Sequence, residues 1–530
     1  MRPIHQQRPR QLDRFWRAAT AIGLIVCALA APAGAQTVST PAAALTALAP
    51  ATQTPLAPSA RAPLAKVRVC DPANPDCPAA KQALSDALER RSQIAQAPPA
   101  AAPPPPAPAA APAPPPAGAA FGGLANAAAA KADENSIRFG LIAPFTGANK
   151  DFAGELKLGA ETAFAAANDA GGVNGKYLRL VVADDGYDPE KTPGLAKMLV
   201  EQSHVFGFLG NFGSATAASI LPYVLEHKLP FFGAFSGAGL LRQQPPDRYV
   251  FNYRPSYAEE AEAAVKYLVR VRHFKPSQIA VFAQDDAFGD AGYLGVEKAM
   301  RALDEDASGT ILHMRYTRNT IDVAAAMEDL RKRHDQVTTS LTKVRERVAG
   351  EATPHLRTVR SVEPGVKAVV MVATYRAAAK FIEKARDLYP DMVFTNVSAV
   401  GSNNFAEELK LLGPRYANGI VVTQIVPDPA GFSSIALEFK AALAKYFPAE
   451  HPDYVSFESY INAKIVLEGL RKAGPQPDSD KFVNALESIH GLDFGLGPTI
   501  NYGSSEHQAI HKIWGSQLDE QGHYHFIDLE

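Results

Sequence analysis

The sequence predicts an α/β fold with parallel sheets, and two features lead to that prediction. The first is a strict alternation of apolar strands and amphipathic helices that begins at Ile137. Strands are expected at residues 137–144, 178–183, 205–209 and 230–234, and helices at 154–170, 189–201 and 215–227. The second feature is that the last two strands are apolar without alternation, as in strands buried on both faces. A βαβαβα order favours a parallel sheet with right-handed crossovers.

The same alternation starts again after Tyr257, so we expect a second α/β domain of similar size. Its strands are expected at 278–283, 310–316, 368–373, 392–397 and 419–426, and its helices at 259–272, 292–302 and 377–388. A helix is expected from residue 323 to about residue 346. The segment 331–364 is longer and more charged than a connection needs, so we expect a helical excursion on the surface with solvated Lys and Arg side chains. The tail is expected to cover both domains, with helices at 434–446, 454–473 and 479–488 and strand-like pieces at 499–502, 511–518 and 524–529.

Two glycine-rich turns follow the last two strands of the first domain. The first turn, residues 210–214, leads into a helix and places Ser214 at the expected N-cap. The second turn is residues 235–239. Glycines let a ligand approach the backbone, and free N–H groups at a helix start bind anions such as carboxylates. Both turns would face one crevice, which indicates a small-molecule site; the alternative is a pair of ordinary turns between strand and helix.

Composition limits the classes of partner. The chain has 530 residues, enough for two or three domains, and a net charge of −2, which gives no electrostatic basis for binding nucleic acid. Its three cysteines are too few for a disulfide scaffold and lack the spacing of a zinc site.

The N-terminus predicts export. Several arginines precede an apolar run over residues 18–31, which is followed by Ala33-Gly34-Ala35. A basic region, a short apolar core and an A-x-A pattern are typical of a secretory signal peptide, here residues 1–35. Lipid attachment at Cys27 is the less favoured alternative, because Val26 is bulky for that processing step.

Residues 36–136 are dominated by Ala and Pro, which predicts an extended, semi-rigid tether. A short helix is expected within it at 79–96. In an exported protein, Cys70 and Cys77 could close a small disulfide loop. Free thiols and pairing with another chain are the alternatives.

Three pieces of the first domain carry a resemblance to a known family. They are the run NDAGGVNGK at residues 168–176, Asp184-Asp185 followed by Asp188-Pro189, and the glycine-rich turn with Ser214. In this βαβ context the combination resembles the leucine/isoleucine/valine-binding protein family, which are periplasmic type I solute-binding proteins of ABC importers. The resemblance covers nearly everything from Ile137 onward and no part of the tether.

The resemblance implies two Rossmann-like lobes joined by three hinge crossovers, with the solute bound in the cleft between them. The crossovers are then expected near residues 253–256, 424–427 and 498–502. Lobe 1 would be residues 137–255 plus 428–497, and lobe 2 would be residues 256–426 plus 503–530. Closure would be a hinge motion, and the closed shape is what a permease recognises.

The resemblance also implies which residues bind the ligand. The implied positions are Phe152, Ser214, Phe235, Ser236, Gly237, Phe288, Tyr375 and Ser398. Ser214 takes the place of the family's carboxylate-binding serine, and the second turn contributes mainly backbone groups. The aromatic residues would line the cleft, with core packing as the alternative. Phe288, in a turn that also holds Gly289, is expected to be exposed to the cleft.

One position departs from the family. Amino-acid binders place an acidic residue after the strand that ends here at Val397, where it meets the ammonium group of the ligand, but this chain has Ser398. A buried ammonium without a carboxylate costs roughly several kcal/mol. The serine therefore favours a carboxylate ligand without an amine, such as an aromatic or aliphatic acid, or another neutral or anionic metabolite. An alignment shift of one residue, or an amine contact from Asp285 or Asp286, would remove this argument.

Other functions have less support in the sequence. No G-x-S-x-G, P-loop or G-x-G-x-x-G motif is present, so we do not expect an enzyme. His507, His511, His523 and His525 cluster in a strand-like region without an H-E-x-x-H motif, so we expect neither a metal nor a cofactor. The alternative function is a periplasmic ligand sensor or an envelope-associated regulatory binding protein with the same fold, since the tether is unusual for a freely diffusing protein.

Together these features predict a periplasmic solute-binding component of an ABC importer. Its solute would be a small carboxylate-bearing metabolite, either an amino acid or an organic or aromatic acid. Its other partners would be the membrane permease and ATPase subunits of the importer. We expect a monomer.

Overall fold

The computed structural model describes residues 135–303, 311–336, 338–346, 355–363 and 365–529. The predicted signal peptide, nearly all of the predicted tether, the Cys70–Cys77 loop and the helix expected at 79–96 lie outside these residues.

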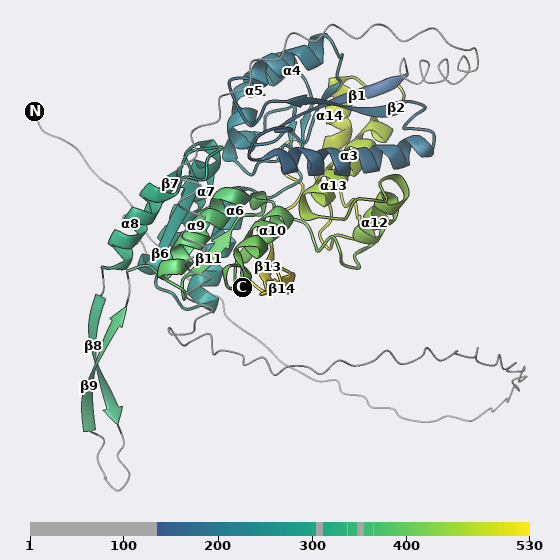
Figure 1. Cartoon of the computed structure of the whole chain (residues 1–530). Coiled ribbons are helices and arrows are strands. Elements are labelled where there is room, and N and C mark those ends of the chain that lie inside the picture. Colours follow the sequence, from purple (N-terminus) through teal and green to yellow (C-terminus); the bar gives the residue numbers. More distant parts are fainter. Residues whose placement is uncertain (1–134, 304–310, 337, 347–354, 364, 530) are drawn as a thin grey trace, which may run out of the picture. The chain divides into compact units, whose positions relative to one another are not determined.

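A five-stranded sheet forms the first part of the fold (Figure 1). Its strands are β1 (Ser136–Ala143), β2 (Tyr177–Asp184), β3 (Gly207–Leu209), β4 (Phe231–Phe232) and β5 (Val250–Phe251). They lie in the order β2-β1-β3-β4-β5, and every pair is parallel. Parallel strands buried on both faces explain the continuous apolar runs of the sequence. The two-residue strand β5 was not predicted.

Helices cover both faces of this sheet. Successive side chains of a strand point to opposite faces, so the apolar side chains of one strand pack against both sets of helices. On one face, Ile142 packs in a cluster with α4 (Thr192–Glu201) and α5 (Ser214–Glu226). On the other face, Phe139 packs in a cluster with α3, α12, α13 and α14. These helices span Lys150–Asp169, Ser434–Tyr446, Tyr454–Ala473 and Ser479–Glu487. We call this sheet with its helices the first lobe.

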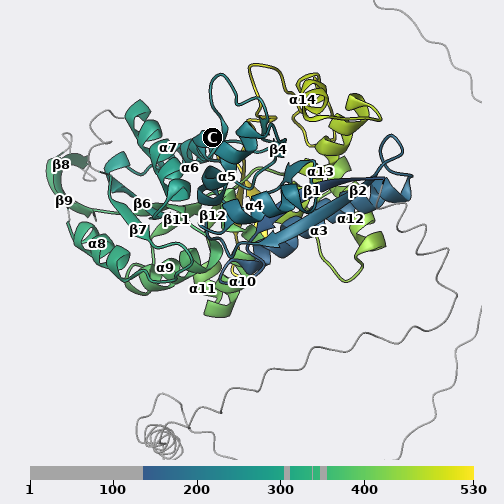
Figure 2. The same cartoon turned by 90° about the horizontal axis from the view of Figure 1, so that it is seen from above.

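A seven-stranded sheet forms the second lobe. Its strands are β6 (Ile279–Gln284), β7 (His313–Tyr316), β10 (Ala368–Val372), β11 (Val393–Asn396), β12 (Val421–Gln424), β13 (Trp514–Leu518) and β14 (Tyr524–Ile527). They lie in the order β14-β13-β12-β11-β10-β6-β7, with antiparallel pairing only at β13 and β14. In Figure 2, α6 and α7 lie on one side of these strands and α8, α9, α10 and α11 on the other.

The helices of the second lobe complete the list of elements. They are α6 (Tyr257–Lys266), α7 (Ala287–Leu303), α8 (Ala324–His334), α9 (Tyr375–Leu388), α10 (Ser402–Leu412) and α11 (Pro414–Ala417). A π-helix continues α6 over Tyr267–Val271, and single 3₁₀ turns lie at Gly239–Leu241, Pro276–Gln278 and Ser398–Val400.

The two sheets repeat one topology. The parallel strands of the second sheet, counted along the chain as β6, β7, β10, β11 and β12, have the same second-first-third-fourth-fifth order as the first sheet. The fold is therefore two Rossmann-like lobes, as the sequence predicts.

The three segments expected to cross between the lobes lie together. The Tyr253 hydroxyl donates to the Ile425 carbonyl over 3.1 Å, and the Tyr502 hydroxyl donates to the Asn252 carbonyl over 3.1 Å. Residues from three distant parts of the sequence therefore contact one another at a single place, which is the arrangement that a hinge between two lobes requires.

One prediction of the sequence is wrong. The expected helix at 323–346 ends as α8 at His334, and the charged segment forms an antiparallel pair of strands, β8 (Thr338–Glu346) and β9 (His355–Glu363). Thr338, Thr339, Thr342 and Val344 are β-branched, which favours a strand over a helix. The number of charged residues in this segment concealed that preference.

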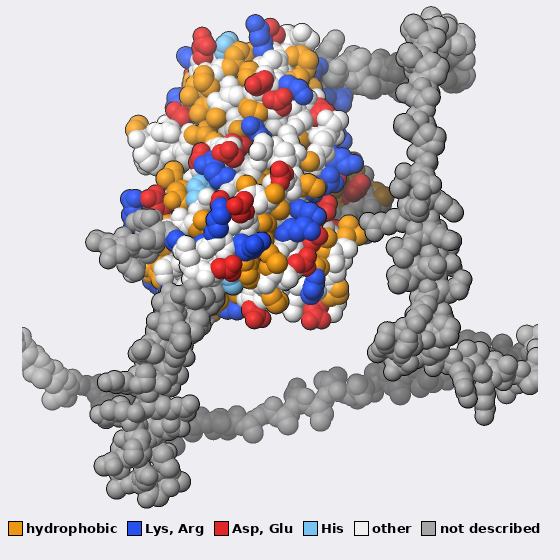
Figure 3. Space-filling view, turned by 60° about the vertical axis from the view of Figure 1, so that its left-hand side comes forward, with side chains coloured by type: hydrophobic (Ala, Val, Ile, Leu, Met, Phe, Trp, Pro, Cys, Tyr) orange, Lys and Arg blue, Asp and Glu red, His pale blue; other side chains and the backbone are white. Residues whose placement is uncertain are grey.

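The surface of the described residues mixes charges of both signs. On the face shown in Figure 3, Lys and Arg side chains are interspersed with Asp and Glu side chains. On this face the two signs of charge are therefore mixed and neither gathers into one large patch.

Candidate functional site

The two glycine-rich turns lie side by side at the carboxyl ends of β3 and β4. The N–H of Phe235 donates to the Asn211 carbonyl over 2.8 Å, and the N–H of Gly213 donates to the Phe235 carbonyl over 3.3 Å. The hydroxyl oxygens of Ser214 and Ser236 are 2.8 Å apart, and both side chains are fully buried. The turns therefore bring two hydroxyl groups together.

Ser214 is not the N-cap that the sequence predicts. It is the first residue of α5, and the cap is Gly213 with φ of 95°, without a hydrogen bond from a side chain. The glycine carries the positive φ that the turn requires, which moves the helix start one residue along. The Ser214 hydroxyl is thereby directed to Ser236 instead of to the helix backbone.

Tyr257, the first residue of α6, reaches the same turns from the second lobe. Its N–H donates to the Gly237 carbonyl over 2.8 Å, and a Cβ atom at Gly237 would lie 2.6 Å from its Cδ1 atom. Only glycine allows this approach. Burial raises the pKa of the Tyr257 hydroxyl, while hydrogen bonds from the Gly237 backbone and the Ser214 side chain act in the opposite direction. The second lobe thus contacts the turns through a phenol.

Aromatic side chains from both lobes pack around the turns. The ring of Phe152 lies 4.7 Å from Phe212, 5.6 Å from Phe235 and 5.4 Å from Tyr375 of the second lobe. The Tyr375 hydroxyl bonds to the Ala148 carbonyl over 2.8 Å and to Asp151 Oδ2 over 2.7 Å. Burial, and then Asp151, raise the pKa of Tyr375. Phe152, Phe235 and Tyr375 are therefore brought together where the lobes meet.

Phe288 is placed differently from the prediction. It is only 3% exposed, and its ring lies 5.0 Å from that of Tyr257. Its position near the start of α7 packs it beneath α6 rather than presenting it openly. The expected exposure is wrong for this arrangement of the lobes.

A carboxylate stands beside Ser398. Glu260 Oε2 accepts from the Ser398 N–H over 2.7 Å, Glu260 Oε1 accepts from the Ser398 hydroxyl over 3.0 Å, and Thr423 Oγ1 donates to Oε2 over 2.5 Å. Glu260 is fully buried. Burial raises the pKa of Glu260, and Arg254 opposes that shift. Helix α6 therefore places a buried carboxylate beside position 398.

The two aspartates considered as alternative amine contacts are both paired with arginine. Asp285, whose side chain is 60% exposed, lies 2.7 Å from Arg315 Nε. Asp286 Oδ2 lies 3.4 Å from Arg318 Nε. The buried carboxylate that contacts Ser398 therefore belongs to Glu260 and to neither aspartate.

A buried ion pair lies next to the turns. Arg254 Nε and Nη2 donate to the two carboxylate oxygens of Glu458 over 2.8 and 2.7 Å, and both side chains are almost completely buried. The guanidinium lies 4.2 Å from the centre of the Phe235 ring. Arg254 thus joins the segment after β5 to α13, directly beneath the second turn.

The C-terminal histidines contact protein groups. His507 stacks on Phe251 at 3.8 Å and lies 2.9 Å from the Val250 carbonyl. His511 lies 2.6 Å from Glu259, and His525 lies 2.7 Å from Asp519. In the part of the chain that the structure describes, no group of three or more His, Cys, Asp or Glu residues is arranged to hold a metal ion.

A family model described as "Periplasmic binding protein" matches residues 136–523, which include the two glycine-rich turns and every strand of the two sheets except β14. The chain belongs to this family. More closely, it is a type I periplasmic binding protein similar to the leucine/isoleucine/valine-binding proteins.

Individual relatives agree with this assignment. The chain is 24% identical over 383 residues to "Leu/Ile/Val-binding protein BraC3" of Rhizobium johnstonii, covering 72% of this chain and 90% of that protein. It is 27% identical over 206 residues to an "Amino acid binding protein" of Pseudomonas aeruginosa, covering 37% of this chain and 50% of that protein. The chain spans about half the length of several curated relatives that it matches.

A solved structure shares the whole fold. It is described as "a possible leucine/isoleucine/valine-binding protein" from Rhodopirellula baltica, and it matches with 30% identity and a TM-score of 0.66. The match covers 75% of this chain and 98% of that one. Among the described residues, no helix has the length and apolarity needed to cross a membrane.

The motif residues typical of the family build the fold of this periplasmic binding protein. Asn168 bonds to the N–H and carbonyl of Leu178 over 2.8 and 2.9 Å and so holds α3 against β2. Asp184 Oδ1 accepts from the N–H groups of Phe145 and Thr146 over 2.9 and 3.2 Å. These side chains are used within the first lobe, which is why the motif predicts the fold better than the ligand.

Four residues of this region were not predicted: Tyr187, Arg254, Tyr257 and Glu260. One of them left a signal in the sequence. Glu260 lies on the same helical face as Tyr257, Ala261 and Ala264, which are buried. A carboxylate within an apolar stripe indicates a buried partner. The other three depend on contacts between distant segments.

Proposed function

We propose that this periplasmic binding protein is the extracytoplasmic solute-binding component of an ABC importer and that it captures a small carboxylate-bearing metabolite between its two lobes. Closure of the lobes around the solute would present a closed shape to the permease. The proposed partners are the permease and ATPase subunits, the proposed compartment is the periplasm, and the proposed state is a monomer.

The observation that supports this most directly is the buried pair of hydroxyl groups on Ser214 and Ser236. Two hydroxyl donors at the start of a helix suit a carboxylate, because the helix N-terminus also carries partial positive charge. Phe152, Phe235 and Tyr375 would surround the apolar part of the solute. As the solute binds, contacts with it would replace the present contacts of Tyr375 and of the two serines.

The contact between Glu260 and Ser398 changes the expected class of solute. A buried carboxylate at this position can balance an ammonium group, so the serine at 398 no longer argues against an amine. We therefore propose amino acids first and amine-free acids second. The name of the curated Pseudomonas aeruginosa relative supports the same order.

A thermal-shift and calorimetric series tests the proposal on the full mature chain. The series compares leucine, isoleucine, valine and phenylalanine with the matching acids that lack the amine and with the matching amides that lack the carboxylate. A solute that binds the folded protein raises the melting temperature, and the rise grows with the ratio of free solute concentration to dissociation constant. Carboxylates should raise it and the amides should not.

Ser214→Ala supplies the matching variant, with Ser219→Ala as control. Ser219 lies on the same helix, but its hydroxyl donates to the Thr216 carbonyl over 2.8 Å and not to Ser236. Loss of a hydroxyl bond to a carboxylate should weaken binding by about ten- to a hundredfold at Ser214 only. Equal affinity of both variants, or binding of the amides, would contradict the carboxylate site.

A further inference from the structure

The family motif at residues 184–189 spans the end of β2 and the start of the loop before α4, and it contains Gly186-Tyr187-Asp188. Its acidic residues are used locally. Asp185 Oδ1 accepts from the Tyr187 N–H over 2.8 Å, and Asp185 Oδ2 accepts from the Thr192 hydroxyl over 2.9 Å. Asp188 Oδ1 accepts from the Glu190 N–H over 3.0 Å. The loop is therefore held in shape from within the first lobe.

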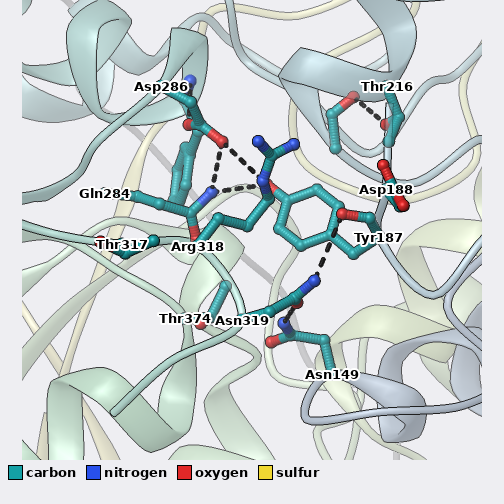
Figure 4. Close-up of polar contacts among 12 residues, drawn as sticks. Asn149, Tyr187, Asp188, Thr216, Gln284, Asp286, Thr317, Arg318, Asn319 and Thr374 are labelled. Carbon is teal, nitrogen blue, oxygen red and sulfur yellow. Dashed lines mark hydrogen bonds and ion pairs between the residues drawn. The ribbon is translucent and has the colours of Figure 1, made fainter. Parts of the chain in front are cut away.

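The Tyr187 side chain is left to contact the second lobe (Figure 4). Its hydroxyl accepts from Gln284 Nε2 over 2.9 Å, at the end of β6. Gln284 Oε1 in turn accepts from the Tyr316 hydroxyl over 3.0 Å. Tyr187 is 1% exposed and Gln284 is 0% exposed. The second lobe therefore contributes to the burial of Tyr187.

Asn319 makes the reciprocal contact from the second lobe (Figure 4). Its Nδ2 group donates to the Gly186 carbonyl over 3.1 Å and to the Tyr187 carbonyl over 3.4 Å. Its Oδ1 atom accepts from Asn149 Nδ2 over 2.9 Å. One side chain of the second lobe thus bonds to two separate loops of the first lobe.

Both residues have a left-handed backbone, with φ of 60° at Tyr187 and 62° at Asn319. Asparagine tolerates this conformation, but a tyrosine rarely adopts it. Such a conformation persists where the surroundings hold it, and it is found most often at functional sites. Here it points the two side chains across the junction of the lobes.

We propose that Tyr187 and Asn319 form a latch that holds the lobes closed and so sets how long a solute stays bound. They are positioning residues: they act on the closed state and need not touch the solute. Each contact exchanges a hydrogen bond with water for one between the lobes, so the latch shifts the equilibrium between open and closed lobes without fixing it. The inference rests on the two-lobe fold and not on the identity of the solute.

Distance measurement in the absence of solute tests the latch. Spin labels are placed on cysteines at Lys197 of α4 and Lys332 of α8, whose side chains are 63% and 64% exposed, in a full chain whose native cysteines are replaced by serine. Double electron–electron resonance then gives the populations of closed and open lobes. Tyr187→Phe combined with Asn319→Gly keeps the ring and the left-handed backbone but removes the hydrogen bonds of these two side chains between the lobes.

We expect the ratio of closed to open protein to fall at least about tenfold in the double variant, since it loses four hydrogen bonds between the lobes and each is worth roughly a factor of two or more. For any solute found to bind, the dissociation rate should rise by the same factor with little change in association rate. The controls are Tyr177→Phe, on the edge strand β2, and Asn174→Gly, whose backbone is also left-handed but whose side chain bonds to Leu470 within the first lobe.

Several results would overturn the latch. One is a native chain that shows only the open distance without solute. Another is a double variant whose distances match those of the native chain while its melting temperature falls, which would make Tyr187 a packing residue only. Because these measurements contain no solute, they can fail while the proposed carboxylate site stands, and the reverse also holds.

Discussion

Glu260 accepts two hydrogen bonds from one residue, Ser398, through its N–H and its hydroxyl. Glu260 belongs to the first helix of the second lobe, and Ser398 follows β11, so helix and sheet edge meet at a buried carboxylate. If this carboxylate balances the amine of the solute, Glu260→Gln should weaken binding of amino acids about ten- to a hundredfold and leave binding of amine-free acids nearly unchanged. Calorimetry on matched pairs of acids measures the difference.

The control for that substitution is Glu262→Gln. Glu262 lies on the same helix, but its side chain is 40% exposed and pairs with Lys266 over 2.7 Å. Glu262→Gln should change neither the affinity for amino acids nor the affinity for amine-free acids. If Glu260→Gln lowered both affinities equally, or lowered only the melting temperature, Glu260 would be a structural residue of the second lobe.

The sequence predicted what depends on neighbouring residues. Continuous apolar runs predicted the buried parallel strands β3 and β4, and glycines predicted the turns that follow them. The N-cap at Ser214 was wrong because Gly213 can take the positive φ of the turn and Ser214 cannot. The meeting of Glu260 with Ser398, or of Tyr187 with Gln284, was beyond prediction, since each joins segments about a hundred or more residues apart through packing alone.

The pair Arg254–Glu458 should be expensive to break from one side. Both side chains are nearly fully buried, so Arg254→Met leaves an uncompensated carboxylate and should lower the free energy of unfolding by about 3–5 kcal/mol. Replacing both partners, as in Arg254→Met with Glu458→Leu, should recover much of the loss. Urea unfolding measures both variants.

Arg248→Met is the exposed counterpart. Arg248 Nε lies 3.2 Å from Asp480 Oδ1, and the two side chains are 44% and 57% exposed. Its loss should cost under about 1 kcal/mol. If Arg248→Met and Arg254→Met lowered the free energy of unfolding by similar amounts, burial would not be what makes the Arg254–Glu458 pair costly to break.

Glu155 should make stability depend on pH. It lies in a groove of about 760 Å³ and bonds from α3 of the first lobe to Asn404 of the second over 2.7 Å, with its other oxygen buried and unpartnered among the described residues. Burial, and then Asp453, raise the pKa of Glu155 well above its ordinary range. The charged residues of this groove are Lys150, Asp151, Lys157, Glu161, Glu407, Glu450, His451 and Asp453.

A folded-state pKa above the unfolded value means that the folded protein binds the extra proton. The stability that Glu155 contributes is therefore present below its unfolded pKa and is lost as pH rises through the folded pKa. Glu155→Gln, which resembles the protonated form, should remove up to about 1.4 kcal/mol per pH unit of this dependence, the slope for one proton. Unfolding free energies measured from pH 4 to pH 8 test it, and identical slopes for both proteins would contradict it.

Gly213 and Gly171 separate two costs of adding a side chain. Both have φ of 95°, so Gly→Ala forces an alanine to take a positive φ at either position. At Gly171 a Cβ atom meets nothing within 4 Å, whereas at Gly213 it would lie 2.2 Å from Cε2 of Tyr187. Gly171→Ala should therefore cost only the backbone term, about 1–2 kcal/mol, as measured by urea unfolding.

Gly213→Ala should cost clearly more than Gly171→Ala, because the ring of Tyr187 must also move. That movement pulls the phenol away from Gln284, so the variant should favour open lobes even where it remains folded. In Gly213→Ala combined with Tyr187→Ala the contact with the ring is gone and Thr216 Oγ1, at 3.0 Å, is the close neighbour that remains, so the cost of the glycine substitution should fall toward the value at Gly171. If it stayed as high as in the single variant, the close contact between Gly213 and Tyr187 would not be what makes this glycine necessary.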